Sequence, residues 1–315
     1  MSKMAKKVII AIPIVIVAIG FVVYFLFPGP VYKLLRNRVR EAAGLEQKHI
    51  QVDAWRITYL DGGRGQALIL LHGFGANKDN WTPVARYLSP HFRLIAPDLP
   101  GFGESSRPMD AKYSIGAQVE RLDQFVTALR IERFHLGGHS MGGAIAGAYA
   151  AKYGYKVNSL WLIAPGGVIS AQPSELAENL VAGHQNILIV ETPEDYDRLM
   201  TFVFVHKPYI PGVIKKYFIS EAIHQRPLNE IIFNQIIAAW SSEPLERLLK
   251  DLPIPALILW GDHDRVLHVS GASVLASLLP KSETVIMEQV GHAPILEKPK
   301  ASAQFLLDFL GKGTP

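Results

Sequence analysis

The peptide Gly138-His139-Ser140-Met141-Gly142 decides the fold, because it places a serine between a short strand and a helix. Residues 133–137 before it have the pattern of a strand, and residues 143–151 after it have a helical pattern with small side chains. So sharp a reversal brings the backbone close to its neighbours, and the two outer glycines leave that space free. Ser140 then occupies the apex of the turn, strained and with its hydroxyl exposed. The peptide predicts a nucleophile; the alternative is a glycine-rich turn with an idle serine.

The composition fits one large α/β domain with additions, since the chain has 315 residues of which 49% are hydrophobic. Cysteine is absent, which excludes disulfides, thiolate metal sites and a thiol nucleophile. Residues 1–48 hold eight Lys and Arg against two Glu, a balance of +6 in a chain whose net charge is +4. The remaining 267 residues therefore carry about −2, and no nucleic-acid partner is expected for them.

The N-terminus reads as a membrane segment. Residues 8–27 are a run of 20 without a charge, long enough to cross about 30 Å of hydrocarbon as a helix. The run ends in Tyr24-Phe25-Leu26-Phe27-Pro28, which is bulky and unsuited to signal-peptide cleavage. We therefore expect residues 1–30 to be a single-pass N-terminal signal anchor in the bilayer; the alternative is a buried helix of a soluble protein.

Residues 31–47 form a basic connector behind the anchor. Its positive side chains, Lys33, Arg36, Arg38 and Arg40, suit contact with anionic lipid headgroups. Three lysines precede the anchor and these four residues follow it, so the charges favour neither orientation of the catalytic part across the membrane.

Beyond the connector, strand and helix patterns alternate. Residues 49–60 read as a hairpin, residues 67–71 and 93–96 as buried strands, and residues 115–129 as a helix. A further helix is expected to begin near Asn80, and a further strand covers residues 159–164. This alternation predicts an α/β fold with a mostly parallel, doubly wound sheet, built from residues 48–167 and 253–315.

The alternation stops at Gly166-Gly167, and residues 168–252 have helical signals. Thr192-Pro193-Glu194-Asp195 is a good helix start, with a capping residue, proline in the first turn and early acids. We expect a helical lid there, in which Phe204 and Ile210 line an acyl tunnel or dip into the membrane; the alternative is that they pack on other lid residues. The sheet resumes at residues 256–260 and 283–287, and a helix over residues 300–310 closes the chain.

A serine hydroxyl needs a base, and His292 is the candidate. It follows the last predicted strand and shares the carboxyl edge of the sheet with Ser140. An acid should hold the imidazole, and the loop 260–264 offers Asp262 and Asp264. Asp264 lies deeper in that loop and is preferred as the catalytic acid, whereas Asp262 is expected to stabilise the loop. The order Ser, Asp, His matches that of the hydrolases built around such a turn.

An oxyanion hole requires two backbone N–H groups aimed at one point. The amide of Met141 is placed by the serine turn, and the second donor is expected from Phe74 in the glycine-containing loop 72–75. His72 is expected to brace that loop. The histidines show no metal-binding spacing, and no G-x-G-x-x-G follows the first strand, so neither a metal nor another cofactor is expected.

With these motifs assembled, residues 48–312 resemble the α/β-hydrolase superfamily. The motifs are His72-Gly73-Phe74, Asp98-Leu99-Pro100-Gly101-Phe102-Gly103, Gly138-His139-Ser140-Met141-Gly142-Gly143, Trp260-Gly261-Asp262-His263-Asp264 and Gly291-His292. Within it, the chain is most similar to membrane-anchored monoacylglycerol lipases and related bacterial membrane lipases. The features shared with these are the anchor, residues 71–81, Thr192-Pro193-Glu194 and Val269-Ser270-Gly271-Ala272.

The resemblance implies hydrolysis of a lipid ester by Ser140, His292 and Asp264, with Phe74 and Met141 as oxyanion donors. The expected function is therefore that of a membrane-tethered serine hydrolase acting on lipid esters such as monoacylglycerols. Two alternatives stay open. One is a hydrolase of carbon–carbon bonds or small non-lipid esters with the same triad, and the other is a binding protein that has lost catalysis.

Overall fold

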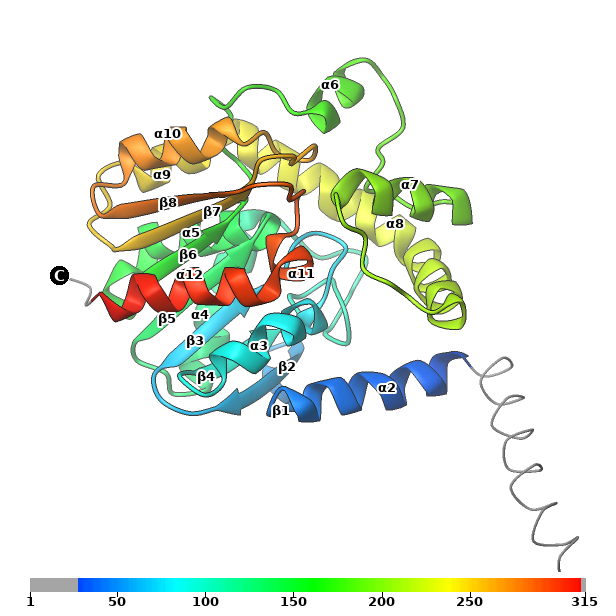
Figure 1. Cartoon of the computed structure of the whole chain (residues 1–315), viewed down its shortest axis with the longest axis horizontal. Coiled ribbons are helices and arrows are strands. Elements are labelled where there is room, and N and C mark those ends of the chain that lie inside the picture. Colours follow the sequence, from blue (N-terminus) through cyan, green and yellow to red (C-terminus); the bar gives the residue numbers. More distant parts are fainter. Residues whose placement is uncertain (1–27, 313–315) are drawn as a thin grey trace, which may run out of the picture.

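The computed structural model describes residues 28–312 and has an eight-stranded sheet at its centre (Figure 1). The strands are β1 (Leu45–Val52), β2 (Trp55–Gly63), β3 (Ala67–Leu71), β4 (Arg93–Pro97), β5 (Phe134–His139), β6 (Val157–Ile163), β7 (Ala256–Gly261) and β8 (Ser282–Met287). Their order in the sheet is β1-β2-β4-β3-β5-β6-β7-β8. Strand β2 runs antiparallel to both of its neighbours, and every other pair is parallel, which confirms the predicted mostly parallel sheet.

Helices cover both faces of the sheet (Figure 1). They are α2 (Pro28–Ala42), η1 (Lys78–Trp81), α3 (Thr82–Leu88), α4 (Ile115–Ala128), α5 (Met141–Tyr153), η2 (Gly154–Lys156), α6 (Glu175–Val181), α7 (Pro193–Val203), α8 (Gly212–Ser242), α9 (Leu245–Leu249), α10 (Ser270–Leu278), α11 (Pro294–Glu297) and α12 (Pro299–Gly311). Side chains of α3, α11 and α12 share one buried cluster, and those of α4, α5, α9 and α10 share another.

Strand β3 shows why its sequence is a continuous apolar run. Ile69 and Leu71 belong to the cluster under α4 and α5, whereas Leu68 and Leu70 belong to the cluster under α3 and α12. All four side chains are fully buried. A strand that is covered on both faces needs no polar side chains. Strand β3 lies inside the sheet, and its carboxyl end lies next to that of β5.

Several predicted elements are confirmed within a residue or two, among them β3, α4 and α12. The hairpin of β1 and β2 is longer than expected and turns at Asp53, whose φ is 48°. The helix expected near Asn80 begins as the short helix η1, capped by the Asn77 side chain, and continues as α3. Helix α10 was not predicted, because Ser270, Gly271 and Ser273 give its first turn weak helix propensity.

Between β6 and β7 lie helices α6, α7, α8 and α9, in the region expected to be helical. Helix α7 begins as its sequence indicated: the Thr192 hydroxyl accepts the Asp195 N–H, and the Asp195 carboxylate accepts the Thr192 N–H. In Figure 1, α6, α7 and α8 lie beyond the end of the sheet, beside the loops that follow its strands.

The apolar span of the predicted membrane anchor, residues 8–27, lies outside the described residues, whereas residues 28–30 begin α2. Within residues 28–312, none of the helices combines the length and the apolar character needed to cross a bilayer. Most of the connector lies in the amphipathic helix α2, whereas residues 45–47 already belong to β1. Tyr32 of α2 packs on the rings of Tyr217 and Phe218 in α8, with centroids 4.8 and 5.0 Å away. Helix α2 therefore touches the inserted helices as well as the hairpin side of the sheet (Figure 1).

Two of the four basic residues expected to face lipid headgroups face the protein instead. The buried Arg40 guanidinium donates to both carboxylate oxygens of Asp79, at 2.5 and 2.6 Å, and Arg36 lies 3.5 Å from Glu104. For Arg40 and Arg36 the headgroup prediction is wrong, because Asp79 and Glu104 of the sheet domain bind their guanidinium groups. The remaining basic residues of the connector, both exposed, are Lys33 and Arg38.

Candidate active site

Ser140 sits between the end of β5 and the start of α5 with φ of 55° and ψ of −118°, a backbone conformation that side chains other than glycine rarely adopt. A Cβ atom on Gly142 would lie 2.2 Å from the Leu71 carbonyl oxygen, and one on Gly138 would lie 2.1 Å from that of Gly142. Both glycines are therefore required by close backbone packing. The Ser140 N–H donates to Ile163 at 2.9 Å, which ties the strained residue to β6.

Asp264 and His292 meet at the carboxyl edge of the sheet. The Nδ1–H of His292 donates to Oδ2 of Asp264 over 2.8 Å, and both residues are buried. Nδ1 carries the proton in this arrangement, because the carboxylate oxygen can only accept. In the neutral ring the second nitrogen, Nε2, is then an acceptor, which is the state a general base requires.

The Asp264 carboxylate is held by four donors. Its Oδ1 accepts the backbone N–H groups of Val266 and Leu267 at 2.8 and 2.9 Å, and its Oδ2 also accepts the Trp260 indole N–H at 3.0 Å. Such a network fixes the carboxylate in place, so its bond to His292 can set the orientation of the imidazole.

Asp262 lies in the same loop but serves it differently. Its Oδ1 accepts the Val290 N–H at 3.2 Å and the His263 ring N–H at 2.6 Å. Burial raises the pKa of Asp262, yet these hydrogen bonds outweigh burial and leave its pKa below the usual value. Among the described residues no hydrogen bond joins Asp262 to His292; Asp262 connects the loop after β7 to the loop after β8.

His292 lies against the serine turn through His139, the residue before Ser140. The two imidazole rings have centroids 4.7 Å apart, and the His139 Nε2–H donates to the His292 carbonyl oxygen at 2.7 Å. The contact between His139 and His292 was not predicted from the sequence. The position of His139 directly before Ser140 was the one signal for it. The structure thus brings Asp264, His292 and the serine turn together at one edge of the sheet.

The loop after β3 borders the same turn. A Cβ atom on Gly73 would lie 3.2 Å from the Ser140 Cβ, so the residue before Phe74 abuts the serine directly. His72 braces this loop: its Nδ1–H donates to the Gly73 carbonyl at 2.8 Å, and its Nε2 accepts the Leu99 N–H at 2.9 Å. Burial lowers the pKa of His72, which keeps it neutral for both bonds.

The two expected oxyanion donors are neighbours of the serine turn: Met141 follows Ser140 in the chain, and Phe74 follows Gly73, which abuts the Ser140 Cβ. Met141 is the first residue of α5, and first-turn N–H groups of a helix have no acceptor within the helix. The Phe74 ring is fixed between Phe102 and Phe233, with centroids 5.9 and 5.5 Å away. An anion beside Ser140 would lie near the positive end of the α5 dipole.

The loop over residues 98–103 is structural. The buried Asp98 carboxylate binds the Lys78 ammonium at 2.6 Å and accepts the Glu104 N–H at 2.7 Å, and Lys78 also binds the Glu104 carboxylate at 2.8 Å. This cluster holds the loop beside the Phe74 loop. The part of the chain that the structure describes contains no cluster of three or more His, Asp or Glu suited to a metal ion.

The two lid residues expected to bind substrate lie in the segment that joins α7 to α8. Phe204 follows α7 directly, next to Val203, whose carbonyl oxygen accepts the His292 N–H at 2.8 Å. Ile210 lies in the loop before α8, beside the exposed Tyr209. Phe204 therefore follows, in the chain, the residue that is hydrogen-bonded to His292.

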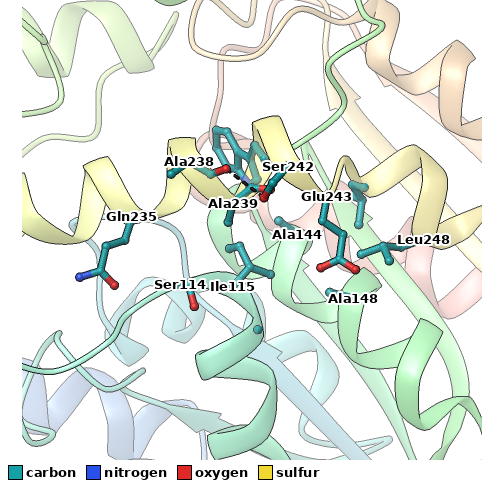
Figure 2. A pocket seen from close by; sticks show the side chains of 13 residues that line it. Ser114, Ile115, Ala144, Ala148, Gln235, Ala238, Ala239, Ser242, Glu243 and Leu248 are labelled. Atoms are coloured by element: carbon teal, nitrogen blue, oxygen red, sulfur yellow. Dashed lines mark hydrogen bonds between the residues drawn. The ribbon is translucent and has the colours of Figure 1, made fainter.

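A cavity of about 450 Å³ lies where the inserted helices meet the core (Figure 2). Its walls come from α4, α5, α8 and α9, and neither Phe204 nor Ile210 lines it. Ala144 and Ala148 form the α5 wall; Ala144 is one turn beyond Ser140 and donates its N–H to the Ser140 carbonyl at 3.1 Å. Ile115, Trp240 and Leu248 add apolar surface, and the polar lining residues include Gln235 and Glu243 (Figure 2).

The chain belongs to the α/β-hydrolase fold family, whose model matches residues 66–299. Lipase 1 of Psychrobacter immobilis is 37% identical over 262 residues, 82% of each chain. The monoacylglycerol lipase ABHD6 of Homo sapiens is 30% identical over 313 residues, 96% of this chain and 92% of that one. A crystal structure of a membrane phospholipase A, described as a bacterial virulence factor, superimposes with a TM-score of 0.89 at 41% identity and covers 98% of each chain. The protein is a carboxylic ester hydrolase.

Proposed function

We propose that this protein is a membrane-tethered serine hydrolase that cleaves lipid esters, monoacylglycerols among them, through an acyl-enzyme. The observation that carries the proposal is the buried hydrogen bond between Asp264 and His292 beside the strained serine turn. Ser140 is the proposed nucleophile, His292 the base and Asp264 the acid that orients the base.

In the first step, Nε2 of His292 takes the proton of the Ser140 hydroxyl while the serine oxygen attacks the ester carbonyl. The tetrahedral intermediate carries a negative oxygen, which the amides of Met141 and Phe74 stabilise; each such donor contributes about 3–4 kcal/mol. Asp264 stabilises the imidazolium through Nδ1. The C–O bond to the alcohol then breaks, and His292 returns its proton to the leaving oxygen.

In the second step, water replaces the alcohol. His292 removes a proton from water, the hydroxide oxygen bonds to the acyl carbon, and the same donors hold the negative oxygen. The bond to Ser140 then breaks, its oxygen regains the proton from His292, and a fatty acid leaves. The enzyme returns to its starting state without a cofactor.

The lipid-ester substrate is supported by the names of the relatives, two lipases and a membrane phospholipase A. The cavity lies beside α5, the helix that begins directly after Ser140, and Ala144 and Ala148 form part of its wall. We assign the cavity to the acyl chain and the segment from Phe204 to Ile210 to contact with the lipid surface.

The organisation we propose follows from the same reasoning. Residues 1–30 anchor the chain in the bilayer, and residues 31–47 connect the anchor to the catalytic core. The core comprises residues 48–167 and 253–315, and residues 168–252 cover it as a lid. Helix α2, bonded to the core through Arg40, would hold the core at a fixed height above the anchor.

One rate panel tests the function. The wild-type chain and Ser140→Ala, both in detergent micelles, are compared on mono-, di- and triacylglycerols and on a soluble p-nitrophenyl ester. We expect monoacylglycerol to be turned over fastest and Ser140→Ala to be inactive on every ester. Retention of a tenth of the rate by Ser140→Ala would refute the nucleophile, and turnover of a dienol ketone without lipid turnover would establish the carbon–carbon alternative.

A further inference from the structure

His139 occupies a closed space between the loop after β3 and the loop that carries His292. A Cβ atom on Gly73 would lie 3.2 Å from its Nδ1, and the His292 ring packs on it with a centroid distance of 4.7 Å. The residue is buried. Its Nε2 must carry a proton, because the His292 carbonyl oxygen, 2.7 Å away, can only accept.

Three polar groups of His292 each make one hydrogen bond within the protein. Its backbone N–H donates to the Val203 carbonyl at 2.8 Å, its ring Nδ1–H donates to Asp264 at 2.8 Å, and its carbonyl oxygen accepts from His139 at 2.7 Å. Within residues 28–312, Nε2 is the polar atom of His292 that none of these bonds engages. The base is therefore fixed at three points, and its catalytic nitrogen is left for the reaction.

We propose that His139 is a positioning residue: its Nε2–H clamps the His292 carbonyl, and so holds the base at a fixed place beside Ser140. The inference deepens, and rests on, the proposed function. His139 immediately precedes Ser140 in the chain, so this one hydrogen bond connects the serine turn directly to the loop that carries His292. Neither Asp264 nor Val203 provides this link, because both belong to other segments.

The chemistry also requires His139 to stay neutral. Burial, and then the nearby positive charge of His292 when protonated, lower the pKa of His139 to about 3. A neutral ring adds no second positive charge next to the imidazolium that forms during catalysis. A lysine or arginine at this position could donate to the same carbonyl, but its charge would oppose protonation of His292.

A matched pair of substitutions isolates the hydrogen bond. His139→Gln keeps an N–H donor at nearly the same reach, whereas His139→Met has the same length and no donor. We expect His139→Met to lower kcat for a soluble ester about 10- to 100-fold, since a small displacement of a catalytic group has that cost. KM should change less than about threefold, and His139→Gln should restore most of kcat.

The other histidine of β5 supplies the control. His135 lies near the start of the strand, bonded to the Ser159 hydroxyl and the Gln66 side chain at 2.8 Å each, away from the carboxyl edge. His135→Met should lower the midpoint of urea unfolding without changing kcat per folded molecule. The downfield proton signal of the bond between His292 and Asp264 should persist in His135→Met and broaden in His139→Met.

The outcomes separate the inference from the function on which it rests. If Ser140→Ala still turns over ester, the proposed function fails. If Ser140→Ala is inactive while His139→Met and His139→Gln have equal kcat per folded molecule, the function stands and the positioning role of His139 is refuted. A lower kcat in His139→Met with rescue by His139→Gln supports the clamp.

Discussion

The carboxylate of Asp264 accepts the Nδ1–H of His292 over 2.8 Å although the two residues are 28 positions apart in the chain. The bond connects the loop after β7 with the loop after β8, two neighbouring parallel strands whose carboxyl ends lie side by side. Asp262, two residues before Asp264, has no such contact and binds Val290 instead. The fold thus distinguishes between two carboxylates that the sequence places almost together.

Asp264→Asn should lower kcat about 10³- to 10⁴-fold, because an amide in place of the carboxylate favours the wrong tautomer of His292. Asp262→Asn is the matched control and should change kcat less than about fivefold, although its amide oxygen accepts the same N–H groups without a charge, which will lower stability by about 1 kcal/mol. Initial rates with a soluble ester and urea unfolding measure both effects. Equal kcat losses in the two variants would contradict the assignment of Asp264.

The two glycines of the serine turn should tolerate no side chain. Gly142→Ala would place a Cβ atom 2.2 Å from the Leu71 carbonyl oxygen, so we expect a loss of at least about 3 kcal/mol in unfolding free energy, or no folded protein. Gly116→Ala, in α4, has open space around its added methyl and should be neutral or stabilising by up to about 1 kcal/mol. Thermal melts of the purified variants compare them. A Gly142→Ala variant as stable as wild type would exclude the close packing described for the turn.

Helix α2 should depend on one arginine. Arg40→Ala leaves the Asp79 carboxylate without its bidentate partner in a mostly buried place, and we expect a loss of about 3 kcal/mol in unfolding free energy. Arg38→Ala removes an exposed guanidinium whose partner Glu41 is also exposed, and should cost less than about 0.5 kcal/mol. Urea titration of the full chain in detergent, followed by tryptophan fluorescence, distinguishes the two. Equal losses would mean that α2 does not dock through Arg40.

Stability should fall in acid partly because of Glu104. Burial raises its pKa, but Lys78, Arg36 and Arg40 outweigh burial, so the pKa in the folded state lies below the usual 4.5. The stabilising effect is therefore complete above 4.5 and is lost as the pH falls through the folded-state value. Glu104→Gln should flatten the dependence of the urea midpoint on pH between about 6 and about 3. Glu41→Gln, at an exposed position, should leave the profile unchanged; identical profiles for wild type and Glu104→Gln would contradict this linkage.

Much of the fold could be predicted because it depends on local patterns. The buried run of β3, the cap of α7 and the serine turn each have a sequence signature that sterics or hydrogen bonding enforces over a few residues. Helix α10 escaped prediction because its first turn lacks strong helix formers, and packing of Ala272 and Leu275 against the core stabilises it instead.

The site could be predicted only in part, because some of its contacts join residues that are far apart in the chain. Chain order and strand ends indicated His292 and Asp264, but the bond from His139 to the His292 carbonyl joins residues 153 positions apart. The periodic pattern of apolar residues in the sequence carries no information about a contact over that separation. Arg40 illustrates the opposite error: its neighbours in sequence suggested a lipid-facing helix, whereas Asp79, 39 residues away, binds its side chain inside the protein.

The central claim is that Ser140 is made reactive by His292, and covalent labelling measures it most directly. The full chain in detergent is treated with a fluorophosphonate, digested and analysed by mass spectrometry, next to His292→Ala and Ser159→Ala variants. We predict one adduct, on Ser140, that forms at the wild-type rate in Ser159→Ala and at least about 100-fold more slowly in His292→Ala. An adduct on another residue, or equally fast labelling of Ser140 without His292, would contradict the account.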